Sequence, residues 1–335
     1  MQALQFFQPD GPAQLTTLPD SSPTGFDLWV AVNAVAVNPV DKKVQAGIRD
    51  TPKTLGWDAC ATVIATGDKV RGFKAGDRVF YAGDVSRPGC FASHQLVDSR
   101  IVGHAPKSLD DWQAASLPLT SLTAWELLFN RLRISLQKDH GKTLLIIGGA
   151  GGVGSMLIQL ARQIAGLNVI ATAGSDESTD WCCNLGAQNT VSHRGDLLAN
   201  YQQSKLPAPD YIVCLADSDF YLPIMAELIK PQGLIGLAVS FNQPVDLNLL
   251  KNKSAGLVWE FMFTRPMLNT EDMQQQQRIL QRIAELIDSG YLRHALTQQF
   301  DQLTDENLQA AHALIEAGKS RGKIALGPIS GTDNA

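Results

Sequence analysis

A run of glycines is the feature of the sequence that points most directly to chemistry. Residues 149–154 read Gly-Ala-Gly-Gly-Val-Gly and fit the pattern G-x-G-x-x-G. The first glycine of this pattern permits a tight turn, the second lets the backbone approach a pyrophosphate, and the third lets a helix pack closely on a strand. The N–H groups and the positive dipole end of that helix then face the phosphates. The residues that we predict to bind a dinucleotide here are Gly149, Ala150, Gly151, Gly152, Val153 and Gly154.

The end of the next predicted strand bears on which dinucleotide is bound. NAD sites usually carry an Asp or Glu there, whose carboxylate binds the ribose 2′-hydroxyl. Here the strand NVIATA (168–173) ends in Gly174 and Ser175, a small neutral turn that leaves room for a 2′-phosphate. Asp176 and Glu177 follow, and they would repel a phosphate if they pointed inward. The sequence therefore favours NADPH, with NADH as the alternative.

Two basic residues are candidates for holding the 2′-phosphate. His193 and Arg194 come at the end of the predicted strand NTVSH (189–193), and a charged donor bonds a phosphate more strongly than a neutral one does. Ser240, which ends the stretch LIGLAVS (234–240), is assigned to the same cofactor site.

The order of the predicted elements places these motifs in one of two domains. A chain of 335 residues is longer than a single core usually fills. Residues 1 to about 105 read as short strands separated by turns, whereas strands and helices alternate from Thr143 onward. Such alternation predicts right-handed βαβ units and a parallel sheet. The glycine motif follows a predicted strand and precedes a predicted amphipathic helix, and this context indicates a dinucleotide site. The alternative is a glycine-rich turn that serves packing alone.

Composition and charge limit the partners. The net charge of −5 argues against a nucleic acid or a membrane surface as the main partner, because both attract basic patches. No apolar run approaches the roughly 18 residues of a membrane helix, and the start MQALQFFQPDGP lacks the pattern of a signal peptide. Five cysteines without C-x-x-C spacing argue against a disulfide scaffold. We expect a cytoplasmic protein that acts on a small molecule.

Several segments of the chain together carry a resemblance to a known family. They are NPVDKKVQAG (38–47), GDKVRGFKAGDRVFYAG (67–83), LPLTSLTAWELL (117–128), the glycine run and SRGKIALG (320–327). Through these segments nearly the whole chain resembles the medium-chain dehydrogenase/reductases, and among them the zinc-free quinone oxidoreductase branch. The resemblance implies an α/β fold with a GroES-like, β-rich catalytic domain made from residues 1–120 and 266–335. A Rossmann NADP-binding domain with a doubly wound parallel sheet, residues 121–265, would be inserted between them. The resemblance also implies an active site in the cleft and a homodimer.

The zinc ligands of the zinc-dependent relatives are missing from this chain. Those relatives place Cys or His where this chain has Pro39-Val40-Asp41, and His where it has Trp57. A tetrahedral zinc site needs thiolate or imidazole donors, but these two segments offer only Asp41 and Asp58. The structural zinc lobe of those relatives has four closely spaced cysteines, and here only Cys90 lies in that region. We therefore predict no metal site.

A reaction without a Lewis acid suits an acceptor that is already electron-poor. Alcohol oxidation loses its means of stabilising an alkoxide, whereas hydride transfer to a quinone or a conjugated enone mainly needs positioning and hydrogen bonds to the developing oxyanion. The resemblance implies that Thr123 contacts the nicotinamide end of the cofactor. The residues that we predict to form the catalytic site are Asn38, Asp41, Lys42, Trp57 and Tyr81.

Each of these residues also has a purely structural interpretation. Asn38 precedes a proline and is suited to a turn, and Asp41 with Lys42 is suited to an exposed helix start with Asp41 as its cap. Tyr81 lies in an apolar strand and is suited to a core position with a bonded hydroxyl. Trp57 is suited to the core and Thr123 to a helix N-cap.

The sequence thus predicts a zinc-free, NADPH-dependent reductase that transfers hydride to a quinone or an α,β-unsaturated carbonyl. Two alternatives stay open. One is an alcohol or aldehyde dehydrogenase of the same superfamily, and the other is a non-enzymatic, crystallin-like NADPH-binding protein. Two departures from the quinone oxidoreductases weigh against NADPH. His193 stands where they have a Tyr that contacts the 2′-phosphate, and Ser178 stands near the position of a phosphate-binding Lys.

Overall fold

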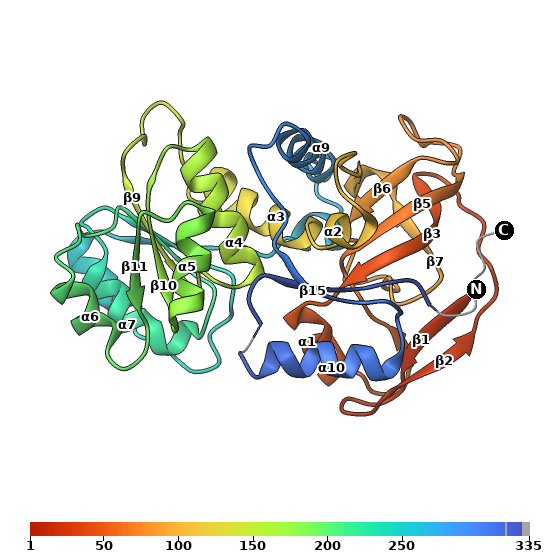
Figure 1. Ribbon diagram of the computed structural model, residues 1–335, viewed down its shortest axis with the longest axis horizontal. Coiled ribbons are helices and arrows are strands. Elements are labelled where there is room, and N and C mark those ends of the chain that lie inside the picture. Colours follow the sequence, from red (N-terminus) through yellow and green to blue (C-terminus); the bar gives the residue numbers. More distant parts are fainter. Residues whose placement is uncertain (319, 330–335) are drawn as a thin grey trace. The chain divides into compact units, whose positions relative to one another are not determined.

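The computed structural model describes residues 1–318 and 320–329, and the chain forms two compact units (Figure 1). One unit comprises Met1–Leu122 together with the chain from Phe263 onward, and the other comprises Thr123–Met262. Residues 319 and 330–335 of the predicted segment 266–335 lie outside the described residues.

The unit Thr123–Met262 is built on a parallel sheet of six strands. Along the sheet the order is β11-β10-β9-β12-β13-β14, and every neighbouring pair is parallel. β9, the first strand of this sheet along the chain, therefore lies in the middle of the sheet. The order of the strands reverses beside it, as in dinucleotide-binding sheets. The predicted doubly wound sheet is confirmed. Its strands are β9 (Thr143–Ile147), β10 (Asn168–Ala173), β11 (Asn189–Ser192), β12 (Tyr211–Cys214), β13 (Leu234–Leu237) and β14 (Gly256–Trp259).

Helices join these strands, and several of them begin at a side chain that caps the helix. The side chains of Ser175, Asp196 and Asp217 accept hydrogen bonds from N–H groups in the first turns of three of them. Gly186 ends one helix at φ +115°, a conformation that glycine adopts without strain. The helical segments of this unit are the last residues of α3 (Pro118–Trp125), which begins in the other unit, the π-helix η2 (Glu126–Arg131), α4 (Gly152–Gln159), the π-helix η3 (Leu160–Ile164), α5 (Asp176–Leu185), α6 (Leu197–Gln203), α7 (Ser218–Leu228) and the 3₁₀-helix η4 (Leu247–Lys253).

Apolar side chains hold this sheet and its helices together. Leu145 and Ile212 of the central strands pack with Tyr201 of α6 and Met225 of α7 in one buried cluster. Burial of apolar area at about 25 cal/mol per Å² is the main favourable contribution to such a core. The core therefore fixes the sheet, and the strand ends that carry the predicted cofactor residues are fixed with it.

The other unit is β-rich, and both ends of the chain contribute to its main sheet. That sheet has the order β15-β16-β3-β5-β6-β8, with β7 paired to β3. The C-terminal strand β16 pairs with β3 through Ala325–Ala36 and Leu326–Val35. A smaller sheet has the order β2-β1-β4. The strands are β1 (Gln2–Phe6), β2 (Ala13–Thr17), β3 (Asp27–Ala36), β4 (Lys53–Thr54), β5 (Ala59–Thr66), β6 (Arg78–Tyr81), β7 (His94–Asp98), β8 (Val102–His104), β15 (Leu296–Phe300) and β16 (Lys323–Leu326).

Helices cover parts of this unit. α9 buries an apolar stripe that includes Ile279, Ile283 and Ile287, as the spacing of an amphipathic helix requires. Among the described residues, no helix is both long and apolar enough to cross a membrane. The helical segments are α1 (Pro39–Ala46), the 3₁₀-helix η1 (Ser99–Ile101), α2 (Asp111–Ala115), α8 (Thr264–Met267), α9 (Gln275–Asp288) and α10 (Asp305–Glu316).

Candidate active site

The glycine run forms the turn between β9 and α4. A Cβ on Gly149 would lie 2.7 Å from the Cβ of Ala171 in the neighbouring strand, and a Cβ on Gly154 would overlap the carbonyl oxygen of Gly148. These two glycines are therefore required by close packing. A Cβ on Gly151, the N-cap of α4, would meet only the Gly148 oxygen at 3.7 Å. The space at Gly151 is open, as a backbone that receives a pyrophosphate requires.

Side chains behind the turn hold it in place. Thr172 Oγ1 accepts a hydrogen bond from Gly148 N at 3.0 Å. Ser155 Oγ donates to Gly151 O at 2.8 Å and accepts from Trp181 Nε1 at 2.9 Å. The first N–H groups of a helix have no partner within the helix. The cradle thus has a fixed shape and donors of the right kind, and the residues present fit a dinucleotide phosphate.

The end of β10 brings the predicted basic pair against Gly174. A Cβ on Gly174 would lie 2.7 Å from Nε2 of His193 and 3.6 Å from Nε of Arg194. His193 N donates to Ala173 O at 3.2 Å, which continues the pairing of β10 with β11. Burial, and secondarily the positive charge of Arg194, lower the pKa of His193. The imidazole is therefore mainly neutral at pH 7, and Arg194 carries the fixed charge beside Gly174.

The acidic residues after Gly174 begin α5. Ser175 caps this helix, since its Oγ accepts from Ser178 N at 3.3 Å and donates to Ser178 Oγ at 3.2 Å. Asp176 and Glu177 are exposed in the first turn, where a negative charge stabilises the N-terminal end of a helix dipole. This placement gives both carboxylates a structural role.

The remaining predicted cofactor residues, Ser240 and Thr123, belong to different elements of the structure. Ser240 is exposed beyond the end of β13. The carboxyl ends of parallel strands lie at the same edge of the sheet. Ser240 therefore comes after the same edge as the glycine turn and Gly174. Thr123 is buried and lies in the interior of α3, which begins at Pro118. The expectation that Thr123 caps a helix is wrong, because proline at the first position starts the helix earlier.

A buried cluster joins Asn38 to two residues that are distant in the sequence. The Lys323 Nζ donates to Asn38 Oδ1 at 2.6 Å and to Asp58 Oδ2 at 2.9 Å. Asn38 Nδ2 donates to the same Asp58 oxygen at 3.0 Å. Burial raises the pKa of Asp58, and the ammonium group of Lys323 opposes that rise. The side chain of Asn38 is thus fully engaged inside the protein.

Lys323 is a residue that the sequence analysis missed as part of the site. Its one signal was a lysine in the otherwise apolar strand GKIALG. An ammonium in such a strand needs buried oxygen partners, but the sequence cannot say which ones.

Trp57 and Tyr81 are both enclosed by the fold. Trp57 is 1% exposed, and its Nε1 donates to Asp84 O at 3.2 Å. The hydroxyl of Tyr81 donates to Gln95 Oε1 at 2.8 Å, and burial raises the pKa of Tyr81 well above its usual range. Both side chains have the contacts of core residues, and the Tyr81 hydroxyl is bonded as its structural interpretation required.

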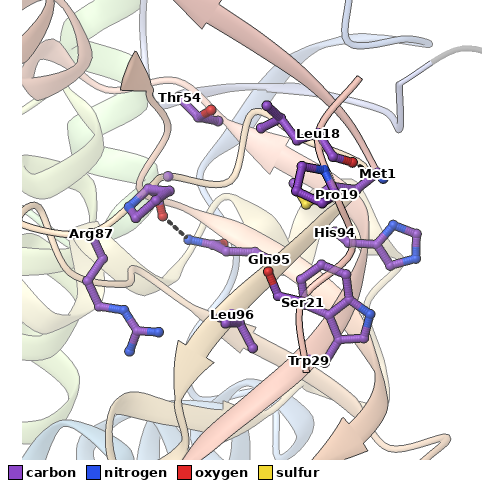
Figure 2. A pocket seen from close by; sticks show the side chains of 12 residues that line it. Met1, Leu18, Pro19, Ser21, Trp29, Thr54, Arg87, His94, Gln95 and Leu96 are labelled. Carbon is purple, nitrogen blue, oxygen red and sulfur yellow. Dashed lines mark hydrogen bonds between the residues drawn. The ribbon is translucent and has the colours of Figure 1, made fainter. Parts of the chain in front are cut away.

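Gln95 links Tyr81 to a cavity of about 290 Å³, which Figure 2 shows. The dashed line in Figure 2 marks the hydrogen bond from Gln95 Nε2 to Pro88 O, at 2.8 Å. Trp29 and His94 also line the cavity, and their rings stack with centroids 5.3 Å apart. None of the predicted catalytic residues lines this cavity.

Asp41 and Lys42 have different surroundings. Asp41 is fully buried in the first turn of α1, where its Oδ2 accepts from Asn38 N at 2.7 Å. The expectation that Asp41 caps the helix is wrong, because Asn38 is the N-cap and Asp41 is the third helical residue, whose side chain bonds the backbone of that cap. The expectation of an exposed pair is also wrong for Asp41. The same oxygen lies 3.3 Å from Nε2 of His312 in α10, a contact with no sequence signal at all. Lys42 donates to Gln45 Oε1 at 3.0 Å and lines a separate cavity of about 400 Å³.

Comparison with known proteins identifies the family. The sequence matches the family "Alcohol dehydrogenase GroES-like domain" over residues 25–107 and "Zinc-binding dehydrogenase" over 185–326. A protein of Staphylococcus aureus named "Zinc-type alcohol dehydrogenase-like protein" is 44% identical over 308 residues, 91% of this chain and 92% of the relative. The chain belongs to the medium-chain dehydrogenase/reductase family. The resemblance noted in the sequence is confirmed.

Solved structures of this family agree with the fold. A Rhizobium etli protein named after zinc-dependent alcohol dehydrogenases is 42% identical, with a TM-score of 0.93 and 98% of each chain covered. The quinone oxidoreductase of Coxiella burnetii is 26% identical, with a TM-score of 0.81, covering 98% of this chain and 99% of that one. This medium-chain dehydrogenase/reductase is an oxidoreductase by family.

The names of several relatives imply zinc, so the side chains of this family member that could ligate zinc are decisive. Within residues 1–318 and 320–329, no three His, Cys, Asp or Glu side chains are grouped so as to hold a metal ion. The Asp58 carboxylate is already paired with Lys323. Burial raises the pKa of the Cys90 thiol, which disfavours the thiolate that zinc binds. The residues present do not fit zinc.

Proposed function

We propose that the protein is an NADPH-dependent reductase that transfers hydride to a quinone or an α,β-unsaturated carbonyl without zinc. The observation that carries this proposal is the buried group of Asn38, Asp58 and Lys323, whose polar atoms satisfy one another. Side chains that bond one another in this way do not ligate zinc, which is the Lewis acid that alcohol oxidation would use. An electron-poor acceptor needs none, because hydride transfer itself creates a stabilised enolate or hydroquinone anion.

The cofactor proposal rests on two places in the Rossmann unit. The backbone at Gly151 and the start of α4 would receive the pyrophosphate, and His193 with Arg194 would bind the 2′-phosphate beside Gly174. NADPH supplies the hydride when it is bound. The protein residues hold the cofactor by its phosphates and thereby fix where the nicotinamide end lies, and orientation of this kind is a large part of catalysis.

The acceptor class follows from the chemistry of the site and from a named relative. The Coxiella burnetii protein, which matches over nearly the whole chain, is a quinone oxidoreductase. We assign the acceptor site to the unit that contains Trp57 and the start of α1. Thr123 remains the proposed contact for the nicotinamide end. Asn38 and Tyr81, whose polar atoms are engaged, contribute by shaping the site and not by proton transfer.

A homodimer in a reducing cytoplasm completes the proposal. In the described chain, the edge strand β14 pairs only with β13. Large apolar side chains are exposed at its end, where Trp259 is the last residue of β14 and Phe261 follows it, each 45% exposed. A free strand edge with apolar neighbours is suited to pairing with a second copy. Sedimentation velocity of the purified protein tests this, with a mass near 36 kDa as the contradicting result.

The central test is stopped-flow oxidation of NADPH with a panel of acceptors. We expect turnover with quinones and conjugated enones, and none with primary alcohols plus NADP⁺. Turnover with alcohols alone would favour the dehydrogenase alternative. NADPH binding without turnover of any acceptor would favour the crystallin-like alternative.

A further inference from the structure

Lys323 joins parts of the chain that are far apart in sequence. It belongs to β16 and is 5% exposed. Besides Asn38 Oδ1 and Asp58 Oδ2, its Nζ donates to the carbonyl oxygen of Val37 at 2.8 Å. An ammonium group has three N–H donors, so each donor has an oxygen partner inside the protein. The three oxygens come from the link between β3 and α1 and from the segment before β5.

Asp58 extends the connection to a fourth segment. Its Oδ1 accepts a hydrogen bond from Leu119 N, the second residue of α3, at 2.7 Å. Its backbone oxygen accepts from Ala36 N at 3.0 Å. The ion pair between Lys323 and Asp58 therefore fixes four segments at one point, namely β16, the start of α1, the Trp57–Asp58 segment and the start of α3.

These segments carry the residues assigned to the proposed reaction. Asn38 starts α1, Trp57 immediately precedes Asp58, and α3 contains Thr123. We propose that Lys323 is a positioning residue of the reductase site, whose ammonium group holds these segments in the arrangement that receives the acceptor. This inference rests on the proposed function. In this role Lys323 contacts neither the acceptor nor the cofactor, but it fixes the position of the residues that contact them.

A buried ion pair can also serve stability alone, and that alternative makes different predictions. Removing one partner of a buried pair leaves the other charge uncompensated and destabilises the fold. Removing both partners restores stability without restoring the connection. Under a purely structural role, activity should return together with stability. Under a positioning role, it should not, because the Val37 and Asn38 oxygens still lack the ammonium that orders them.

The experiment compares Lys323→Met with the double variant Lys323→Met/Asp58→Asn. Methionine keeps much of the length of the lysine stem but removes the charge, and asparagine keeps an oxygen for Leu119 N. The matched control is Lys230→Met, since Lys230 is also paired with an aspartate, Asp210, but is 40% exposed. For each variant we would measure kcat and KM for a quinone, the dissociation constant for NADPH and the midpoint of thermal unfolding.

We expect Lys323→Met to unfold at lower temperature and the double variant to regain most of the loss. In both, kcat/KM for the quinone should fall by about tenfold or more, since misplacement of about 1 Å can cost a hundredfold. The dissociation constant for NADPH should stay within about twofold, and Lys230→Met should match wild type. If Lys323→Met does not fold, the double variant alone decides.

The outcomes separate this proposal from the proposed function. A double variant with wild-type stability and wild-type kcat/KM would overturn the positioning role and leave the reductase function standing. A wild-type protein that reduces no acceptor would overturn the proposed function and the positioning role together. NADPH affinity that falls in parallel with kcat/KM would also count against positioning of the acceptor side.

Discussion

Gly174 and His193 are in such close contact that no other residue fits at position 174 without moving the imidazole. A Cβ there would lie 2.7 Å from Nε2 of His193, closer than two such atoms can approach. The glycine is thus the reason that the end of β11 can bring His193 and Arg194 beside the end of β10. A residue with the carboxylate typical of NAD sites would occupy the space that the basic pair now holds.

Replacing Arg194 should weaken NADPH binding selectively. The guanidinium carries the fixed positive charge beside Gly174, and a charge-assisted hydrogen bond contributes about 1.5–3 kcal/mol. Arg194→Ala should raise the dissociation constant for NADPH about tenfold to a hundredfold, while NADH binding stays nearly unchanged. Fluorescence titration with both cofactors measures this. Arg282→Ala, in an exposed ion pair on α9, is the control, and tighter binding of NADH than NADPH by wild type would contradict the cofactor proposal.

Introducing a carboxylate at position 174 should reverse the preference. In Gly174→Asp the new side chain displaces the imidazole of His193, repels a 2′-phosphate and offers an acceptor to a 2′-hydroxyl. The ratio of kcat/KM for NADPH to that for NADH should fall by at least about a hundredfold, which corresponds to about 2.7 kcal/mol. Gly174→Ala separates the steric effect from the charge, because it moves His193 without adding a carboxylate. Equal ratios for the two variants would show that charge plays no part.

Metal content gives a direct check on the donor set. Because Asp58 is paired with Lys323 and no group of three donors is present among the described residues, the purified protein should contain far less than one zinc per chain. Quinone reduction should also persist in a strong chelator. Elemental analysis by mass spectrometry, with a zinc-dependent alcohol dehydrogenase as the positive control, measures the first quantity. One zinc per chain that tracks with activity would refute the claim.

The glycine cradle could be predicted from the sequence because its signal is local. Strand, glycines and helix follow one another within about twenty residues, and the physical reason for each glycine depends on its immediate neighbours. Thr123 was misjudged although a local signal existed, since Pro118 marks the true start of α3. The start of α1 was misjudged in the same way, since Asn38 is its N-cap and Asp41 is the third residue of the helix.

The buried polar contacts could not be predicted, because each joins distant parts of the chain. Asp58 and Lys323 are 265 positions apart, and Asp41 and His312 are 271 apart. A pattern of residue types carries no record of such pairs. They exist because β16 returns to pair with β3 and because α10 packs near α1, and both events depend on the whole fold.

A buried pair of glutamates in the Rossmann unit predicts how stability changes with pH. Glu126 and Glu260 are both buried, and Arg131 Nε donates to Glu260 Oε2 at 2.7 Å. Burial, and then the neighbouring Glu126 carboxylate, raise the pKa of Glu260 to about 9, although Arg131 opposes the rise. The folded protein therefore holds a proton at neutral pH that the unfolded chain releases, since an unfolded glutamate titrates near 4.5.

The sign of the effect follows from this retained proton. A raised pKa in the folded state contributes stability that is complete below pH 4.5 and is lost as the pH rises towards 9, by at most about 1.4 kcal/mol per pH unit. Glu260→Gln keeps an oxygen for Arg131 and removes the titration. The free energy of unfolding of the variant minus that of wild type should therefore increase by about 1–3 kcal/mol from pH 5 to pH 8.5. Urea unfolding at several pH values measures the difference, with Glu285→Gln on the exposed face of α9 as the control. Curves for Glu260→Gln and wild type that stay parallel over this range would show that the pair does not retain the proton.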